Sequence, residues 1–314
     1  MSRTALVTGG AGFIGSHLTD ELLSRGYTVV VVDDMSLGKR SNLPKSDRLH
    51  IIELDARKCH TLAQLLRHFA PIDVIFNLAV VPLPASLSTP KNTFDVNVQI
   101  TSTMCELVRK DIASTLVQFS SSEVYGTAEY VPMNESHPLN GRTPYAASKI
   151  ASDCLVQSYG HTFGIDYSII RPFNTIGPRQ NAGSYAGIVP VTINRCLSDC
   201  SPVIHGDGSY SRDYSWVGDI VTAALRVYDC PATRGLVVNI GSGEEISVND
   251  VVSAIIASTG GDLALVHTSD RPGDVRRLCA DASRARKLIG YKPSMSFDEA
   301  LDRTIEWYVG RKHD

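Results

Sequence analysis

Thr8-Gly9-Gly10-Ala11-Gly12-Phe13-Ile14-Gly15 is the stretch of sequence that decides the fold of this chain. It follows the apolar run Ala5–Thr8, which predicts a strand, and it opens the helical pattern of Gly15–Arg25. Its glycines satisfy both G-x-G-x-x-G and G-x-x-G-x-x-G, spacings that allow positive φ and a close approach of the backbone to a pyrophosphate. The helix amino terminus offers unpaired N–H groups to the same phosphates. The stretch therefore predicts a dinucleotide-binding turn, with cofactor contacts at Gly9, Gly12, Phe13, Ile14 and Gly15.

An acidic residue after the next strand selects between the nicotinamide dinucleotides. The valine-rich run Tyr27–Val32 predicts a buried parallel strand, and Asp33 follows it directly. A carboxylate at this place accepts hydrogen bonds from ribose hydroxyls and repels a 2′-phosphate, and Asp34 adds to the repulsion. We therefore expect NAD as the cofactor, although Lys39 and Arg40 leave NADP open as the alternative.

Short apolar runs alternate with helical patterns through the first half of the chain. The further strands that we expect are Leu49–Leu54, Val74–Leu78, Leu116–Ser120 and Tyr167–Arg171. The helices that we expect between them are Leu62–Phe69, Phe94–Arg109 and Tyr145–Gly160. This repetition predicts an α/β fold with a doubly wound parallel Rossmann sheet, which binds ligands at the carboxyl ends of its strands. We assign residues 1–173 to this NAD-binding domain.

A smaller C-terminal α/β lobe is expected after residue 173, where the alternation stops. The Gly- and Pro-rich stretch Asn174–Tyr185 predicts a loop, and Val237–Ile240 predicts one more strand of the main sheet. The helices that we expect here are Val189–Leu197, Val248–Ser258 and Asp298–Tyr308. Residues 174–314 would thus form the substrate-binding lobe, while a strand near 236–241 completes the first domain.

The composition and charge exclude several classes of protein. The 314 residues are 43% hydrophobic and 20% charged, as in ordinary globular proteins. Thirty basic and 33 acidic residues give a net charge of −3, which indicates neither a nucleic-acid partner nor a membrane partner. No apolar run approaches the ~20 residues of a membrane helix and no signal peptide is seen, so we expect a cytoplasmic protein. The seven cysteines include no C-x-x-C pair, which favours reduced thiols and no metal site.

A tyrosine and a lysine lie four residues apart in the expected helix Tyr145–Gly160. Residues at i and i+4 share a helix face, so the Tyr145 phenol and the Lys149 ammonium would lie together. A phenol has a reference pKa of ~10, and a neighbouring ammonium and a nicotinamide cation would favour its phenolate. Ser120-Ser121-Ser122 ends the preceding strand, where a serine can hydrogen-bond the same substrate hydroxyl. The pattern indicates proton transfer beside a nicotinamide.

Together these motifs resemble those of the extended short-chain dehydrogenase/reductases, in the branch of NAD-dependent nucleotide-sugar epimerases and dehydratases. The resemblance covers nearly the whole chain. Its further motifs are Leu54-Asp55, Asn77-Leu78-Ala79, Asn97, Ser120-Ser121-Ser122-Glu123-Val124-Tyr125-Gly126, Arg171-Pro172-Phe173-Asn174, Arg212-Asp213-Tyr214 and Arg271-Pro272-Gly273-Asp274. Val80-Val81-Pro82 departs from the family, which often has Ala-Ala and then a polar or basic residue near the cofactor phosphates. This departure concerns one cofactor contact and leaves the predicted fold unchanged.

The resemblance implies a role for each matching residue. Tyr145 would act as acid and base on the sugar C4 hydroxyl, and Ser121 stands at the place of the family's catalytic Ser or Thr. Lys149 would hold the nicotinamide ribose and lower the pKa of Tyr145. The implied substrate-binding residues are Ser121, Ser122, Asn174, Arg179, Arg212, Arg271 and Asp274, among which Arg212 and Arg271 suit a diphosphate. The implied cofactor contacts outside the glycine-rich turn are Asp33, Asp34, Asp55, Leu78, Ala79, Asn97, Tyr145 and Lys149.

The fate of a 4-keto sugar separates the reactions of the family that this chain resembles. An epimerase returns the hydride to the other face of the sugar, a 4,6-dehydratase needs further acid/base groups near C5 and C6, and a decarboxylase releases carbon dioxide from a uronic acid. Glu123, a further candidate catalytic residue, follows Ser122 where similar dehydratases carry Asp-Glu. Ala146-Ala147-Ser148 is unlike the decarboxylases, and Arg271–Arg276 is more similar to the 4-epimerases. Alternatively, Glu123 would be an ion-paired carboxylate that takes no part in the reaction.

We therefore favour a UDP-sugar 4-epimerase that acts on UDP-glucose or UDP-glucuronate. The alternatives are a UDP-N-acetylhexosamine 4,6-dehydratase and then a UDP-glucuronate decarboxylase. A non-catalytic dinucleotide-binding protein is the least favoured, because such proteins usually lose the tyrosine or the lysine that this chain keeps. The resemblance also implies a homodimer in which Phe94–Arg109 and Tyr145–Gly160 of two copies form a four-helix bundle.

Overall fold

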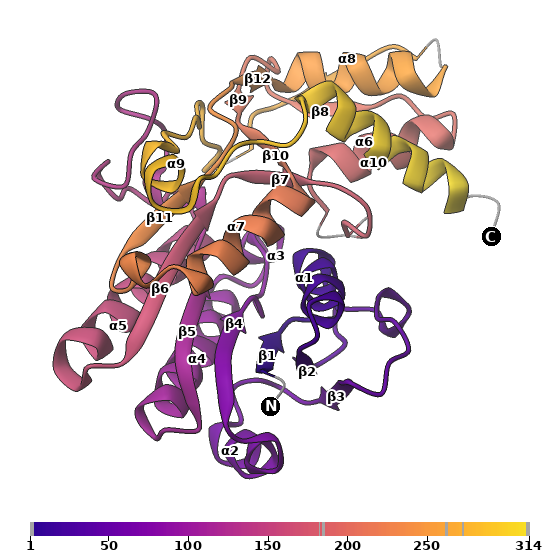
Figure 1. The fold of residues 1–314 in the computed structure, drawn as a ribbon. Helices are drawn as coiled ribbons and strands as arrows, with labels where there is room; N and C mark the ends of the chain where they lie inside the picture. Colours follow the sequence, from indigo (N-terminus) through magenta and orange to yellow (C-terminus); the bar gives the residue numbers. More distant parts are fainter. Residues whose placement is uncertain (1–2, 182, 184–185, 261–262, 272, 312–314) are drawn as a thin grey trace.

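A parallel sheet of seven strands forms the centre of the protein (Figure 1). The computed structural model describes residues 3–181, 183, 186–260, 263–271 and 273–311. The strands of this sheet are β1 (Thr4–Thr8), β2 (Thr28–Asp33), β3 (Leu49–Glu53), β4 (Ile72–Asn77), β5 (Ala113–Phe119), β6 (Asp166–Pro172) and β11 (Val237–Ile240). Their order is β11-β6-β5-β4-β1-β2-β3, so the winding direction reverses between β1 and β4. The predicted doubly wound Rossmann sheet is confirmed.

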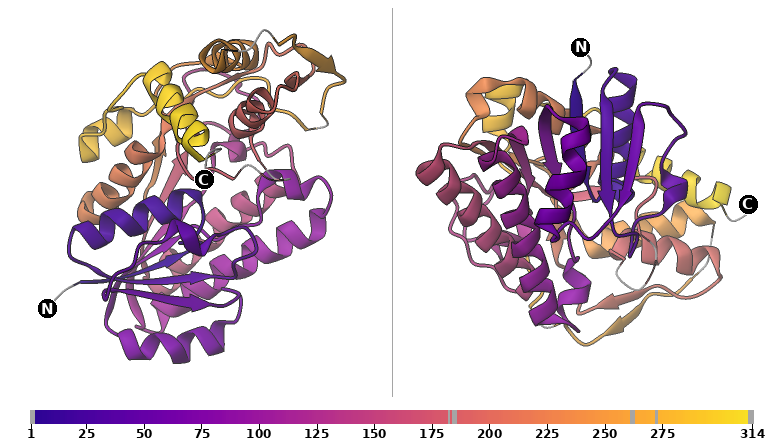
Figure 2. Two further views of the ribbon diagram at one scale, coloured as in Figure 1. Left: turned by 90° about the vertical axis from the view of Figure 1, so that its right-hand side faces the viewer. Right: turned by 90° about the horizontal axis from the view of Figure 1, so that it is seen from below.

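Helices cover both faces of the sheet (Figure 2). The helices on one face are α1 (Phe13–Ser24), α7 (Val217–Asp229) and α9 (Ser283–Ile289). Those on the other face are α2 (Cys59–Leu66), α4 (Pro90–Arg109) and α5 (Pro144–Phe163). Successive strand residues point to opposite faces, so Val29 and Val31 join the first core while Val30 and Val32 join the second. Each fully buried valine stabilises the sheet by ~1.5–3 kcal/mol, which explains the valine-rich sequence of β2.

The second lobe lies beyond the carboxyl edge of the sheet, at the top of Figure 1. Its helices are α6 (Ile188–Leu197), α8 (Val248–Thr259) and α10 (Phe297–Arg311), which share an apolar core. Its paired strands are β7 (Asn174–Ile176) with β10 (Tyr214–Trp216), β8 (Val203–His205) with β13 (Val266–Thr268), and β9 (Ser211–Arg212) with β12 (Ile246–Ser247). β7 lies inside the stretch 174–185 that we expected to be a loop throughout; residues 182, 184 and 185 of that stretch lie outside the described residues.

The short helical segments complete the element list. They are α3 (Leu83–Ser86), η1 (Arg40–Asn42), η2 (Arg67–Phe69), η3 (Ser122–Tyr125) and η4 (Pro231–Thr233). Across the part of the chain that the structure describes, every helix is too short or too polar to span a bilayer.

Segments from the second half of the sequence complete the sheet and its cover. β11 lies in the second half of the sequence, yet it pairs in parallel with β6, with Asn239 beside Arg171. Ile220 and Ala224 of α7 and Ala285 of α9 lie in the same apolar core as the strand residues of the first half. One face of the sheet is therefore covered by α1 together with α7 and α9, which come after residue 174, and the chain crosses between the lobes several times.

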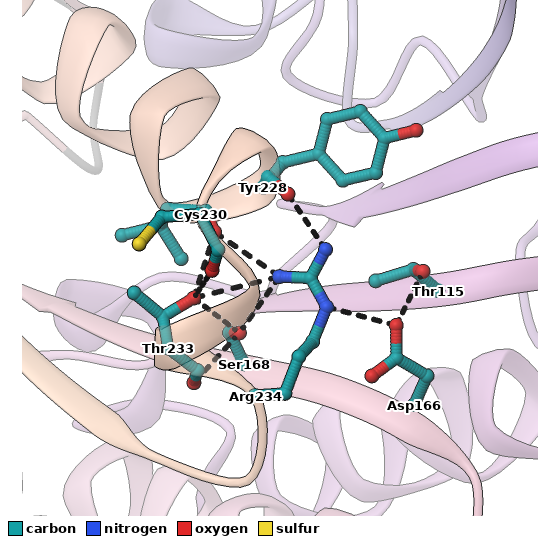
Figure 3. A network of polar contacts seen from close by, with 8 residues as sticks. Thr115, Asp166, Ser168, Tyr228, Cys230, Thr233 and Arg234 are labelled. Atoms are coloured by element: carbon teal, nitrogen blue, oxygen red, sulfur yellow. Dashed lines mark hydrogen bonds and ion pairs between the residues drawn. The ribbon is translucent and has the colours of Figure 1, made fainter. Parts of the chain in front are cut away.

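A polar network around Arg234 fastens one of these helices to the sheet (Figure 3). The Arg234 guanidinium donates to the carbonyls of Val227, at 3.1 Å, and Tyr228, at 2.6 Å, which end α7. Its Nε donates to Asp166 Oδ2 at 2.8 Å, and Thr115 Oγ1 donates to the same oxygen at 2.7 Å. Carbonyls at a helix end have no partner within the helix, so the arginine satisfies them. The contacts join α7 to the amino ends of β5 and β6, opposite the edge that carries the glycine-rich turn.

Candidate active site

The glycine-rich turn between β1 and α1 is packed too tightly for side chains. Gly9 has a φ of +67°, and a Cβ at this residue would lie 2.8 Å from the Ala79 amide nitrogen. A Cβ at Gly15 would lie 2.2 Å from the Gly9 carbonyl oxygen. Gly12 precedes the first turn of α1 and has no side chain to cap it. This cradle of backbone N–H groups fits the pyrophosphate of a dinucleotide.

The carboxylate of Asp33 lies beside this turn. Its oxygens accept hydrogen bonds from the amides of Ala11, at 3.0 Å, and Met35, at 2.9 Å. Burial raises the pKa of Asp33, and these two bonds oppose the rise. A carboxylate has about four lone-pair sites, so it retains acceptor capacity for a ribose. Asp34 is exposed and accepts hydrogen bonds from the amide and the hydroxyl of Ser36, and its contact with a cofactor stays a prediction.

Three more of the expected cofactor residues lie at the carboxyl ends of the neighbouring strands. Leu78 and Ala79 donate their amide hydrogens to Thr8 Oγ1 at 3.1 and 3.2 Å, which locks the end of β4 against β1. Asp55 follows β3 and accepts from Arg57, including Nη2 at 2.5 Å. These bonds lower the pKa of Asp55. The contacts of Leu78, Ala79 and Asp55 with a cofactor stay predictions.

Asn97 of α4 connects the loop after β4 to α5. Its Oδ1 accepts from the Val81 amide at 2.8 Å. Its Nδ2 donates to the Val81 carbonyl at 3.2 Å and to Ser148 Oγ at 2.9 Å. Both amide hydrogens are thus engaged within the protein. Asn97 supports the loop that contains the unusual Val80-Val81-Pro82, and its direct contact with the cofactor stays a prediction.

The start of α5 places Tyr145 and Lys149 at the end of β5. Thr143 caps the helix by accepting a hydrogen bond from the Ala146 amide at 3.2 Å. The Ser121 side chain lies near enough to the Tyr145 phenol to lower its pKa. Lys149 Nζ donates to the Phe119 carbonyl at 2.6 Å. Tyr145, Lys149 and Ser121 therefore come together at the carboxyl edge of the sheet, as the sequence predicts.

Burial shifts the pKa values of this pair in opposite directions. It raises the pKa of Tyr145 to about 12; Ser121 opposes that rise, while the charges of Glu123 and Asp153 add to it. Burial lowers the pKa of Lys149 to about 8, although the charge of Asp153 opposes the change. The lowering of the phenol pKa by Lys149 and a nicotinamide cation, which the resemblance implies, stays a prediction.

Glu123 lies at the start of η3, where its charge acts on Tyr145. Ser121 Oγ accepts a hydrogen bond from the Glu123 amide at 3.2 Å, which caps η3. Burial raises the pKa of the Glu123 carboxyl; the Arg212 charge opposes the rise and the Asp274 charge adds to it. The same carboxylate raises the pKa of Tyr145. The charges of Arg212 and Asp274 therefore both act on Glu123, on the side of the site that faces the second lobe.

The remaining residues that we expect to bind substrate differ in their burial and in their partners. Ser122 is 3% exposed within η3, and Asn174 begins β7 directly beyond β6. Arg271 precedes Asp274, whose amide donates to the Arg271 carbonyl at 3.2 Å. Arg179 pairs instead with Asp20 of α1 at 2.7 Å. Its predicted contact with a substrate would require a second bond from the same guanidinium.

Sequence reasoning missed two buried groups of polar residues. Asp213 accepts from the amides of Ser242, Gly243 and Ala280 at 2.7 to 3.0 Å, so it fixes the loops that border Arg212. Asp153 of α5 pairs with Arg171 of β6 at 2.9 Å, with side chains 2% and 4% exposed. Both acids were visible in the sequence, but no local pattern marks them as buried. Among the described residues, no three His, Cys, Asp or Glu side chains gather as a metal site requires.

Known proteins resemble this chain over nearly its whole length. A family model described as GDP-mannose 4,6 dehydratase matches residues 6–304. A Mycolicibacterium smegmatis protein named UDP-glucose 4-epimerase is 37% identical over 308 residues, which span 96% of this chain and 97% of that protein.

Solved structures extend the likeness to three dimensions. The UDP-glucose 4-epimerase of Thermotoga maritima, solved with UDP-glucose, has a TM-score of 0.93 at 30% identity and covers 98% of this chain and 99% of its own. The dTDP-glucose 4,6-dehydratase DesIV of Streptomyces venezuelae, solved with NAD, has a TM-score of 0.93 at 30% identity, over 99% of this chain and 98% of its own. The chain therefore belongs to the family described as GDP-mannose 4,6 dehydratase, together with nucleotide-sugar epimerases and dehydratases.

Proposed function

We propose that this enzyme is a UDP-sugar 4-epimerase that works through a transient 4-keto sugar. The observation that carries the proposal is the placement of Tyr145 and Lys149 one helical turn apart on α5, at the carboxyl edge of the sheet, where the Ser121 side chain acts on the Tyr145 phenol. The 37% identity to a UDP-glucose 4-epimerase over nearly the whole chain supports the epimerase reaction and UDP-glucose as substrate; UDP-glucuronate is the alternative sugar.

NAD is the cofactor of this enzyme. The tight glycine turn and the buried Asp33 suit it, and the DesIV structure with the same fold holds it. When bound, NAD accepts a hydride from the sugar C4 and later returns it.

The residues of this chain then have separate tasks. Tyr145 removes the proton of the C4 hydroxyl, and Ser121 orients that hydroxyl. The Lys149 ammonium favours the phenolate electrostatically. Arg212 and Arg271 bind the diphosphate, because guanidinium groups form charge-assisted bonds with phosphate oxygens. An epimerase requires no proton transfer at C5 or C6, so Glu123 would act here only through its charge.

Glu123 favours one second candidate, a nucleotide-sugar 4,6-dehydratase. Its carboxyl lies next to Tyr145, and burial raises its pKa, as suits a group that moves a proton near neutral pH. The DesIV dehydratase matches the fold as well as the epimerase of Thermotoga maritima does. The two reactions differ in whether the carboxyl exchanges a proton with the substrate.

NMR of the purified enzyme with a panel of UDP-sugars in D₂O tests the proposal. We expect inversion at C4 without incorporation of deuterium, because the hydride that leaves C4 returns to it. A 6-deoxy-4-keto product that carries solvent deuterium would establish the dehydratase instead. A pentose product would establish a decarboxylase.

The substitution Glu123→Gln separates the two candidates within the site. In an epimerase it should change turnover only mildly, whereas in a dehydratase the loss should be comparable to a general acid/base contribution of ~10²–10⁴-fold. Glu129→Gln, at an exposed position close by in the chain, is the matched control. A large loss for Glu123→Gln alone would contradict the epimerase.

We also propose that two copies form a homodimer through α4 and α5. These helices pack against each other, and the outer side of α5 exposes Ala147, Cys154 and Ser158 at helical spacing. Phe94 of α4 is 38% exposed on the same pair of helices. Small residues on one helix allow the close approach of a second pair, and a two-fold dimer is the commonest oligomer.

A further inference from the structure

Asp153 lies one helical turn beyond Lys149 on α5, and both residues are buried, with exposed fractions of 1% and 5%. Its Oδ2 accepts three hydrogen bonds, from Ser120 Oγ at 2.8 Å and from Arg171 Nε and Nη2 at 3.1 and 2.9 Å. Its Oδ1 is buried and has no hydrogen-bond partner in the described part of the chain. A buried carboxylate oxygen without a partner is unfavourable unless positive charge lies nearby. The Arg171 and Lys149 charges both act on this carboxylate.

Asp153 and Lys149 together hold the end of β5. Lys149 Nζ donates to the carbonyl of Phe119, and Asp153 accepts from the hydroxyl of Ser120, the next residue. The residue after that is Ser121, whose side chain acts on the Tyr145 phenol. Two side chains on one face of α5 therefore fix the strand end that presents the catalytic serine.

The charges around Lys149 come from three elements. Tyr145 and Asp153 belong to α5, Glu123 and Tyr125 to η3, and Arg171 to β6. Of these groups, Asp153 acts on Lys149 and opposes the effect of burial. Arg171 stays protonated at any ordinary pH, and its Nη1 is already committed to the Tyr125 hydroxyl at 3.0 Å. Without the Asp153 charge, two buried cations would lack a counter-charge, and lysine is the one that can release its proton.

We propose that Asp153 is a positioning residue of the active site, which keeps Lys149 in its ammonium form and holds the Ser120–Ser121 strand end against Tyr145. This inference rests on the proposed roles of Tyr145 and Lys149. Asp153 itself touches neither substrate nor cofactor in this scheme, so its effect reaches the reaction through Lys149 and Ser121.

The test is the titration of Lys149 in the NAD-bound enzyme. Lysine is labelled with ¹³C, and the Lys149 signal is assigned by its loss in Lys149→Met. In Asp153→Asn, which keeps the size and removes the charge, we expect the Lys149 titration midpoint to fall by about one unit or more. Turnover of the UDP-sugar identified by the panel should fall most on the alkaline side and recover partly as the pH is lowered. An unmoved midpoint would overturn the proposal.

Further variants separate charge from structure. Asp153→Glu should restore the midpoint, and Ser120→Ala should lower turnover without moving it, because it removes the hydrogen bond and keeps the charge. Asp166→Asn is the matched control: it breaks another Arg–Asp pair of β6, at the opposite end of the strand (Figure 3). We expect it to leave the Lys149 midpoint unchanged.

A variant with the opposite expected sign covers the case in which Asp153→Asn does not fold. Arg171→Gln leaves Lys149 as the single cation beside Asp153, so the Lys149 midpoint should rise; a midpoint that stays or falls contradicts the inference. Failure of the proposed function is recognised separately. If Tyr145→Phe is fully active, the roles of Tyr145 and Lys149 are wrong, whereas an inactive Tyr145→Phe with an unmoved midpoint in Asp153→Asn refutes the positioning role alone.

Discussion

Two residues one helical turn apart, Tyr145 and Lys149, have pKa values that burial shifts in opposite directions, to about 12 and to about 8. Burial disfavours the charged form of each group, which is the phenolate of one and the ammonium of the other. At neutral pH burial therefore opposes the phenolate that the proposed proton transfer needs, and it also weakens the hold of the lysine on its proton; the charge of a bound nicotinamide would favour the phenolate. A nearby carboxylate that supports the ammonium matters more at such a site than at the protein surface.

Tyr145→Phe removes one hydroxyl and should leave the packing of α5 intact. We expect turnover to fall by at least ~10²–10⁴-fold, because the C4 hydroxyl loses its general base. Single-turnover kinetics and the content of bound NAD measure the effect. Tyr130→Phe, at a tyrosine that is 44% exposed, is the control and should behave like the unmodified enzyme. Near-normal turnover of Tyr145→Phe would refute the mechanism.

Lys149→Met should be inactive yet more stable at neutral pH, measured on protein freed of nucleotide. The folded state releases the Lys149 proton near pH 8, whereas the unfolded chain holds it up to its ordinary pKa of 10.5. The unfolded state thus binds more protons between these values, so the stability of the unmodified protein rises with pH across that window. Below it, burial of the charge costs on the order of 3 kcal/mol.

Urea unfolding at a series of pH values measures this prediction. The gain in the free energy of unfolding of Lys149→Met over the unmodified protein should be largest below pH 8 and should shrink toward pH 10.5. The lost hydrogen bond to the Phe119 carbonyl should reduce this gain by about 1 kcal/mol at every pH. A stability difference that does not change with pH would contradict it.

At the scale of elements, the turn between β1 and α1 was predictable because its residue types encode its backbone geometry. The glycine spacing predicts that backbone atoms pass too close to leave room for side chains. The structure shows such close approaches at Gly9 and Gly15. Helix α7 was not expected, although its apolar residues Val217, Ile220, Val221 and Ala224 follow the helical spacing. The pair of Asp153 and Arg171 could not be predicted, because only the folded sheet brings α5 and β6 together. The same limit applies to the short strands of the second lobe.

Gly15→Ala tests the turn as a unit. The added Cβ would meet the Gly9 carbonyl oxygen at 2.2 Å, which is backbone and cannot move aside cheaply. We expect a clear loss of stability and of bound NAD. Gly310→Ala is the matched control in α10, where an added Cβ meets nothing within 4 Å. There alanine should stabilise the helix by ~0.5–1 kcal/mol. Thermal unfolding of both variants, with NAD content after heat release, decides the matter.

At the scale of the whole molecule, the proposed dimer and the exchange of segments between lobes lead to separate predictions. If α4 and α5 form the interface, Cys154→Arg should convert the dimer to a monomer, because it places a charge at the centre of the exposed stripe of α5. Cys200→Arg, at an exposed cysteine beyond α6, is the matched control and should stay dimeric. Static light scattering measures the mass; a monomeric unmodified protein would end the proposal.

The exchange of segments predicts that residues 1–173 do not fold alone. In the full chain, Val31 and Phe76 belong to an apolar core that includes Ile220 and Ala224 of α7. A chain that ends at residue 173 would keep α1 on this face of the sheet, would leave in water the part that α7 and α9 cover, and would also lack β11. We expect aggregation or a molten state, visible as few dispersed amide signals in NMR. A well-dispersed spectrum of 1–173 would show that the remaining cover suffices.

The same threading of the chain restricts how this enzyme can evolve. The Rossmann domain draws on both halves of the sequence, since β1 and β11 belong to its sheet and α9 covers one face of it. A single genetic crossover therefore cannot transplant the second lobe from one relative to another without also replacing part of the sheet. New sugar specificities in such a chain must arise by point substitutions and loop insertions in place, and engineers who seek chimeras will need at least two junctions.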